Sequence, residues 1–143
     1  MDGIKYIVDC LNNGKMPTDD IGTELGDYLD SLSESFYLEA QERQYIDEYG
    51  DTNADEKLII VSAVKLEKDY ILETLDLFMD ISEEGESYLL SNLKYDEYYF
   101  VQYWEGVLDQ YTDDRYWHGI YYSEDAAKEE ALKLIPSDYV CTM

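Results

Sequence analysis

A polar segment near the middle of the chain has the spacing that opens a calcium-binding loop. Asp51, Asn53 and Asp55 would supply oxygen ligands at positions one, three and five of an EF-hand loop. Position six of that loop requires glycine and position twelve a bidentate glutamate, but this chain has Glu56 and Ser62 there. We therefore favour a polar turn in which Asn53 or Asp55 caps a following helix, and we expect no metal and no cofactor. A divalent-cation site remains an alternative.

The sequence carries none of the common catalytic signatures. His118 is the single histidine, and a lone histidine among tyrosines and tryptophans is more often a packed ring than a catalyst. The chain has no GxSxG element, Gly-rich phosphate loop, HExxH motif or cluster of His and Cys. Carboxylate pairs are so numerous that none stands out as a glycosidase-like dyad. We therefore expect a protein that is not an enzyme.

Negative charge is the property that sets this chain apart. Thirty-four Asp and Glu against ten Lys and Arg give a formal net charge of −24. Self-repulsion of this kind opposes the compact state, so its retention points to an electropositive partner. The hydrophobic content of 45% is ordinary for a folded protein, so the charge does not indicate disorder.

The acidic residues fall on one side of two expected helices. Their three- and four-residue steps correspond to about 4.5–6 Å along a helix axis, a scale similar to the spacing of about 3.4 Å between phosphates on one DNA strand. Almost no lysines are interleaved to neutralise them through i,i+4 pairs. The expected partner-binding residues form a first acidic ridge (Asp20, Glu24, Asp27, Asp30 and Glu34) and a second acidic ridge (Asp69, Glu73, Asp76, Asp80, Glu83 and Glu84).

Tyrosine is the second unusual feature, with 16 Tyr against 3 Phe. A tyrosine can bury its ring and keep its hydroxyl in water, which suits a surface that contacts a partner. Tyr37, Tyr45 and Tyr49 are the candidate anchors beside the ridges. Most tyrosines in the expected strands are assigned to packing of the sheet.

This acidic and aromatic character resembles that of DNA-mimic inhibitors, the small proteins with which phages and mobile elements block restriction enzymes, CRISPR nucleases or DNA repair enzymes. The resemblance is one of composition. It implies a non-enzymatic inhibitor that occupies the basic nucleic-acid-binding groove of a nuclease or another DNA-binding enzyme. Such a protein would bind neither nucleic acid nor membrane, would act in the cytoplasm of a bacterial host cell, and could form a homodimer.

Three other classes of protein remain open. An immunity protein that neutralises one cognate nuclease toxin has the same acidic and aromatic character. An acidic adaptor domain would use the charge without imitating nucleic acid. A halophilic housekeeping domain would be acidic without any partner, although charge clustered in stripes fits that class poorly.

The hydrophobic pattern predicts one α+β domain over residues 1–143, organised around a long helix at 55–81. Residues 55–81 are apolar around most of the helical girth, with a single polar stripe that begins at Ser62 and Lys65 and continues into the second acidic ridge. The competing interpretation is a strand at 57–66, because Ile59, Ile60 and Val61 are β-branched.

The other elements are expected on both sides of this helix. Further helices are predicted at 2–13, ending before Gly14, and at 18–36, with a bend at 33–35. Others are predicted at 37–49, at 87–93 and at 124–135, the last with Ser123 as its cap. A three-stranded antiparallel meander is predicted at 98–104, 107–112 and 115–122, followed by a loose strand at 137–143.

The sequence also indicates an intracellular protein. The N-terminus lacks the basic start and apolar run of a signal peptide, and the longest largely apolar run, 58–64, is far too short to span a membrane. Cys10 and Cys141 form no metal-binding pattern, and two free thiols are the expected state.

Overall fold

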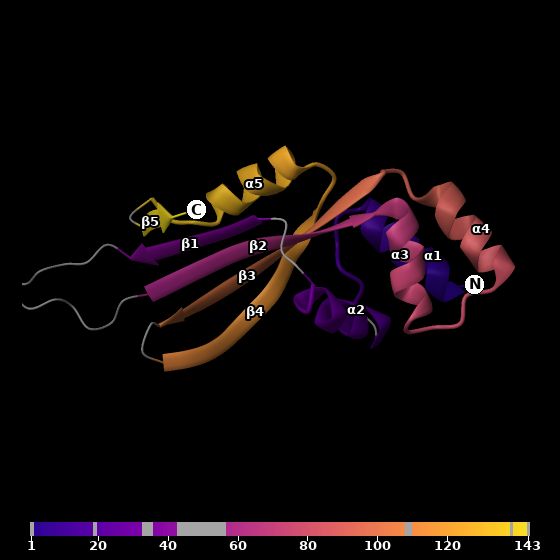
Figure 1. Cartoon of the computed structure of the whole chain (residues 1–143), viewed down its shortest axis with the longest axis horizontal. Coiled ribbons are helices and arrows are strands. Elements are labelled where there is room, and N and C mark those ends of the chain that lie inside the picture. The colour runs from indigo at the N-terminus through magenta and orange to yellow at the C-terminus, as the bar shows by residue number, and fades with distance from the viewer. Residues whose placement is uncertain are drawn as a thin grey trace, which may run out of the picture.

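The computed structural model describes residues 2–18, 20–32, 36–42, 57–107, 110–137 and 139–142. These residues have an α+β fold, as predicted, with helices on both faces of an antiparallel sheet (Figure 1). In chain order the elements are α1 (Asp2–Asn12), α2 (Asp20–Asp30), β1 (Phe36–Glu42), β2 (Lys57–Glu67), α3 (Lys68–Asp76), α4 (Glu83–Asn92), β3 (Glu97–Val107), β4 (Gln110–Tyr121), α5 (Glu124–Lys133) and β5 (Tyr139–Thr142).

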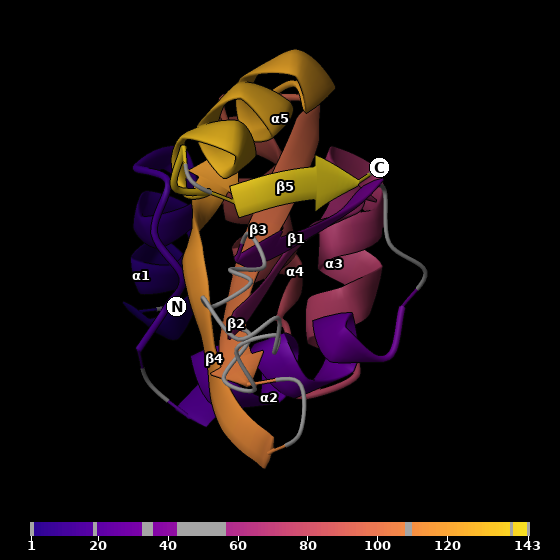
Figure 2. The same cartoon turned by 90° about the vertical axis from the view of Figure 1, so that its left-hand side faces the viewer.

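The sheet has the strand order β4-β3-β2-β1-β5, and β2 is its central strand. Strands β1 to β4 form an antiparallel meander in which each strand pairs with the next along the chain. After β4 the chain passes through α5 to the opposite edge, where β5 pairs with β1 (Figure 2). The predicted three-stranded meander is therefore too small, because it lacks β1 and β2. The described residues of the separate strand predicted at 107–112 belong instead to the end of β3 and the start of β4, which are both longer than expected.

Two apolar clusters lie on opposite faces of the sheet. One joins α1, α2, α3 and α4 to side chains of the sheet that include Val64, Leu66 and Phe100. The other joins Ala127 and Ala131 of α5 to side chains on the other face. In Figure 1, α5 lies above the strands, while α1, α3 and α4 gather beyond one end of them.

The long helix predicted at 55–81 is wrong. Its first part is β2 and only its second part, α3, is helical. Because both faces of β2 are covered by helices, its apolar residues do not alternate with polar ones, and such a strand resembles a helix that is apolar on all sides. Ser62 and Lys65 therefore belong to the sheet and do not continue the second acidic ridge.

The helix predicted at 37–49 is also wrong where the structure describes it. Residues 36–42 form β1, which lies between β2 and β5. Leu38 and Ala40 are both buried, and their spacing of two residues is the period of a strand. The bend predicted at 33–35 and the residues at 43–56, including the polar turn and its helix cap, lie outside the described residues.

Several other predictions of local structure are confirmed. Helix α1 ends at Asn12, and Gly14 adopts φ 75°, a conformation that favours glycine. Ser123 caps α5 by accepting a hydrogen bond from the Ala126 amide at 3.2 Å. The predicted helix at 18–36 is shorter than expected, as α2, and the one at 87–93 begins earlier, as α4, with Ser82 as its cap. The loose C-terminal strand is present as β5.

Helix α2 rests on its neighbours through two glycines. A Cβ atom added to Gly22 would overlap the backbone carbonyl of Pro17, and one added to Gly26 would lie 2.8 Å from Nε1 of Trp117 in β4. Both glycines are buried. The close approach they allow fixes how α2, and the acidic ridge on it, sits against the rest of the protein.

None of the helices in the described part of the chain is long and apolar enough to cross a membrane. Cys10, on α1, is a free cysteine.

Candidate functional site

The two acidic ridges lie on the solvent side of their helices. Every described ridge residue is exposed, and Glu34 lies outside the described residues. Helix α2 turns Leu25 and Leu29 into the core, which directs its carboxylates outward. Helix α3 does the same by burying Ile71 and Leu75. The remaining ridge residues are Asp80 in the following turn and Glu83 and Glu84 at the start of α4.

Lysines of α5 form ion pairs with several acids of the same helix, and none is seen to do so with the described ridge carboxylates. Lys128 pairs with Glu124 at 3.3 Å, and Lys133 lies 3.7 Å from Glu130. Among the described residues, no Lys or Arg forms an ion pair with a ridge carboxylate. Among the contacts between described residues, the Asp30 carboxylate accepts a hydrogen bond from Gln102 in β3, which ties this end of the first ridge to the sheet.

Some ridge carboxylates occupy positions that weaken their own helix. Asp20, Asp69, Glu83 and Glu84 lie in first turns, where the helix dipole favours a negative charge. Asp30 and Asp76 instead end α2 and α3, and neither helix has a basic residue in its last turn. A carboxylate there costs about 0.3–1 kcal/mol. At Asp30 the hydrogen bond from Gln102 offsets this cost, so Asp76 is the acid whose presence stability of the fold does not explain.

Replacing Asp76 by asparagine is expected to raise the free energy of unfolding by about 0.3–1 kcal/mol, because it removes a negative charge from the C-terminal end of α3. Urea denaturation at low ionic strength measures this change. The matched control is Asp69→Asn in the first turn of the same helix, which relieves the same overall repulsion but loses a favourable dipole interaction. Asp69→Asn should be the less stable of the two variants. The reverse order would mean that the Asp76 carboxylate supports the fold.

A groove lies between the two acidic helices. A cavity of about 190 Å³ is lined by Tyr28 of α2, by Tyr70, Glu73 and Thr74 of α3, and by Leu77, the residue after α3. Helices α2 and α3 lie next to each other in both views of the fold (Figures 1 and 2). The groove therefore brings an aromatic and aliphatic surface next to a ridge carboxylate.

Contacts around the groove fix its walls. The ring of Tyr28 packs edge-on against Phe78, with ring centroids 5.7 Å apart. A hydrogen bond with the Tyr70 side chain, together with burial, raises the pKa of Tyr28 above its usual value. Buried Thr74 donates its hydroxyl hydrogen bond to the Tyr70 carbonyl at 2.8 Å. Tyr70 remains 42% exposed and Leu77 63% exposed.

Sequence reasoning missed these two groove residues. It placed Leu77 on the apolar girth of a long central helix and did not single out Tyr70. Their spacing from Glu73, three residues before it and four after, was the available signal, because such positions share a helix face. Of the tyrosines proposed as anchors, Tyr37 is exposed on β1 and donates a hydrogen bond to Glu39 at 3.1 Å. Tyr45 and Tyr49 are outside the described residues.

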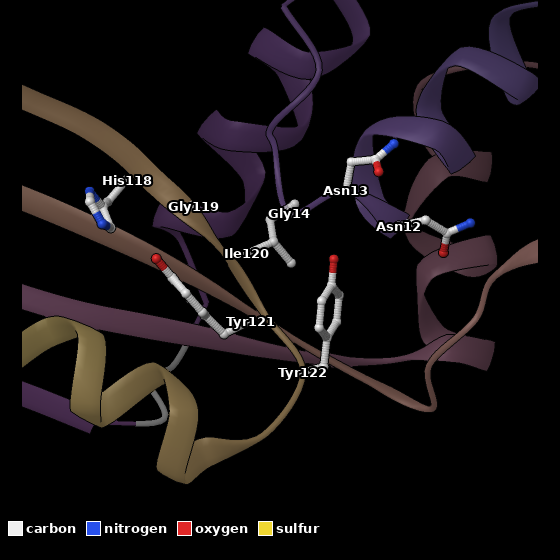
Figure 3. A pocket seen from close by; sticks show the side chains of 8 residues that line it. All are labelled: Asn12, Asn13, Gly14, His118, Gly119, Ile120, Tyr121 and Tyr122. Carbon is white, nitrogen blue, oxygen red and sulfur yellow. The ribbon is translucent and has the colours of Figure 1, made fainter.

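A second hollow, of about 520 Å³, lies where the end of α1 meets β4 (Figure 3). Much of its polar lining ties these two elements together. The Tyr122 hydroxyl donates to the Leu11 carbonyl at 2.8 Å, and burial raises the pKa of Tyr122 to about 12. The Ile120 amide donates to the Gly14 carbonyl at 3.0 Å. His118, on the far side of the hollow, contacts Glu130 of α5, with Nε2 and Oε1 3.4 Å apart.

Metal ligation has no geometric support in the described residues, since no group of three or more His, Cys, Asp or Glu side chains there is arranged to hold an ion. The calcium-like segment at 51–55 is outside the described ranges, so that alternative stays a prediction.

Comparisons with known proteins add no family. No protein-family model, curated protein or solved structure matches this chain. The charge, exposure and contacts of its surface are therefore the basis for a functional proposal.

Proposed function

We propose that this protein is a non-enzymatic inhibitor that imitates nucleic acid and blocks the basic binding groove of a nuclease or another DNA-binding enzyme. The supporting observation is the pair of exposed acidic ridges on α2 and α3. Their carboxylates form no ion pairs with described basic residues, whereas the acids of α5 do. One of them, Asp76, also occupies a helix end where a negative charge reduces stability. Retention of costly, unpaired charge is what a binding surface for a basic partner requires.

The physical basis of such inhibition is electrostatic. A field from a net charge of −24 attracts a basic groove over several ångströms and accelerates encounter at low salt. The ridge carboxylates then take the places of phosphates opposite lysines and arginines of the enzyme. Because the attraction is between charged surfaces, binding weakens as ionic strength rises.

The proposed partners are restriction enzymes and CRISPR effectors in a bacterial cytoplasm, where a phage or mobile element would gain from blocking them. This assignment follows from charge complementarity with enzymes that hold a negatively charged substrate.

An affinity capture tests the proposal. The immobilised protein is exposed to a bacterial lysate supplemented with candidate restriction and CRISPR nucleases at low salt, and bound proteins are eluted with a salt gradient. We expect basic nucleic-acid enzymes to elute as salt rises, and added duplex DNA to block their capture. Capture of a single protein that is indifferent to DNA would favour an immunity protein or adaptor instead. No capture, together with loss of the fold at low salt, would mean that the acidity is an adaptation to the protein's environment and that the proposal is wrong.

A further inference from the structure

We propose that the groove between α2 and α3 is a pocket for an arginine side chain of the basic partner. The inference rests on the proposed function, because it names the group that the acidic surface recognises. Its lining is Tyr28, Tyr70, Glu73, Thr74 and Leu77.

The first argument is the exposed apolar surface of the groove. Leu77 is 63% exposed and the ring of Tyr70 is 42% exposed, although both lie beside a cavity of about 190 Å³. Apolar surface that borders a cavity gains from being covered by a partner. The aliphatic stem of a long basic side chain can cover it while its charged end stays near water or a carboxylate.

The second argument is charge complementarity. Glu73 lines the groove, and Asp69 and Asp76 lie on the same face of α3, one turn on either side of it. An exposed leucine or tyrosine alone would suit an apolar partner, but one carboxylate in the lining and two more on the same helix face disfavour a partner without positive charge. The occupant that satisfies both surfaces is a cation on an aliphatic stem.

The third argument distinguishes arginine from lysine. A guanidinium group is planar, stacks on aromatic rings and binds a carboxylate through two parallel hydrogen bonds, whereas an ammonium group is more strongly hydrated and binds as a point charge. The groove offers both partners of a guanidinium, the exposed Tyr70 ring and the Glu73 carboxylate. We therefore expect arginine to be preferred.

The groove is also formed before any partner arrives. The Tyr28 ring is packed against Phe78 and hydrogen-bonded to Tyr70, and the Thr74 hydroxyl is held by the Tyr70 carbonyl. A pocket with fixed walls loses less conformational entropy when it is filled.

A titration with short peptides tests the pocket without any enzyme. The isotopically labelled protein is titrated with tri-arginine, tri-lysine and tri-citrulline, and NMR shifts are followed at Tyr70, Thr74 and Leu77. Tri-arginine should give saturable shifts in the groove, tri-lysine weaker ones, and the uncharged tri-citrulline none. Shifts spread evenly along both ridges, with equal responses to arginine and lysine, would overturn the pocket.

Variants separate the ring from the charge. Tyr70→Ala should weaken tri-arginine binding about two- to fivefold, the range of a cation–π contact at an exposed site. Tyr70→Phe keeps the ring and should bind like the unaltered protein. The matched control is Tyr116→Ala, which removes another exposed tyrosine, 50% against 42%, that lies on β4 and does not line the groove. Circular dichroism confirms that each variant is folded. An equal loss in Tyr116→Ala and Tyr70→Ala would contradict the proposal.

The same variants distinguish failure of the pocket from failure of the proposed function. If basic enzymes are captured and Tyr70→Ala captures them equally well, the pocket is wrong and nucleic-acid mimicry stands. If tri-arginine binds in the groove but no basic enzyme is captured in competition with DNA, the pocket stands and the mimicry is wrong.

Discussion

Reversing the charge of Asp69, Glu73 and Asp76 together to lysine is expected to abolish binding of a basic partner while the fold persists. All three side chains are exposed on α3, and the helix is anchored by other residues, Ile71 and Leu75. Two unit charges about 4 Å apart in water interact by about 1 kcal/mol, so turning three attractions into repulsions should weaken binding at least about 100-fold. Capture of the partner at low salt measures the loss, and circular dichroism the fold.

The control for this triple variant has the same net charge. Reversal of Glu124, Asp125 and Glu129 to lysine changes three exposed acids on α5, which covers the other face of the sheet. Binding should fall far less in this control, because only the overall field changes and not the proposed contacts. Retained binding by the α3 variant with its fold intact would place the binding face elsewhere. An equal loss of binding in both variants would mean that binding depends only on the overall negative charge and not on the ridge of α3.

Replacing Gly22 by alanine is expected to destabilise the protein by about 1–3 kcal/mol or more, the usual cost of overpacking. Alanine in a helix is intrinsically favoured over glycine by about 1 kcal/mol. At this position the added Cβ would overlap the Pro17 carbonyl, which is backbone and cannot rotate away. Part of α2 must therefore move for the variant to fold. The midpoint of urea unfolding measures the change.

Two other glycines provide a graded control. Gly3 lies in α1 with nothing within 4 Å of an added Cβ, so Gly3→Ala should be neutral or stabilising by up to about 1 kcal/mol. Gly26→Ala should lie between the two, because its nearest neighbour is the Trp117 side chain, which can shift. A Gly22→Ala variant as stable as Gly3→Ala would contradict the close packing of α2 on the segment before it.

Periodicity and capping residues predicted the helices near the two ends of the chain and the strands after α4, but they did not predict the central strand of the sheet. Helix α1 and its Gly14 stop, α5 and its Ser123 cap, and strands at β3 and β4 follow from periodicity and capping residues. Strand β2 was not predicted in this way, because a strand covered on both faces lacks the alternation of apolar and polar residues that identifies strands. The β-branched run Ile59–Val61 was the correct indication, and the apparent continuity of a polar stripe outweighed it.

The candidate site divides in the same way. The ridge residues of α2 and α3 were predicted to share exposed faces, and the structure places the described ones on such faces because three- and four-residue spacing is a property of a single helix. The groove depends on Tyr28 meeting Tyr70 and Phe78, residues more than forty positions apart in the sequence. A contact between helices of this kind depends on tertiary packing, and no local pattern in one chain reveals it.

The junction between β2 and α3 has a consequence for how such a protein can change over time. Strand β2 is the middle strand of the sheet, and α3 begins at the residue after it, with the Lys68 amide bonded to the Asp96 carbonyl at 2.9 Å. The outward side chains of α3 therefore follow directly on the central strand of the sheet without contributing to its packing. Their identity can be exchanged while the scaffold is kept, so under the proposed function a lineage bearing this fold could follow a target enzyme that alters its own groove.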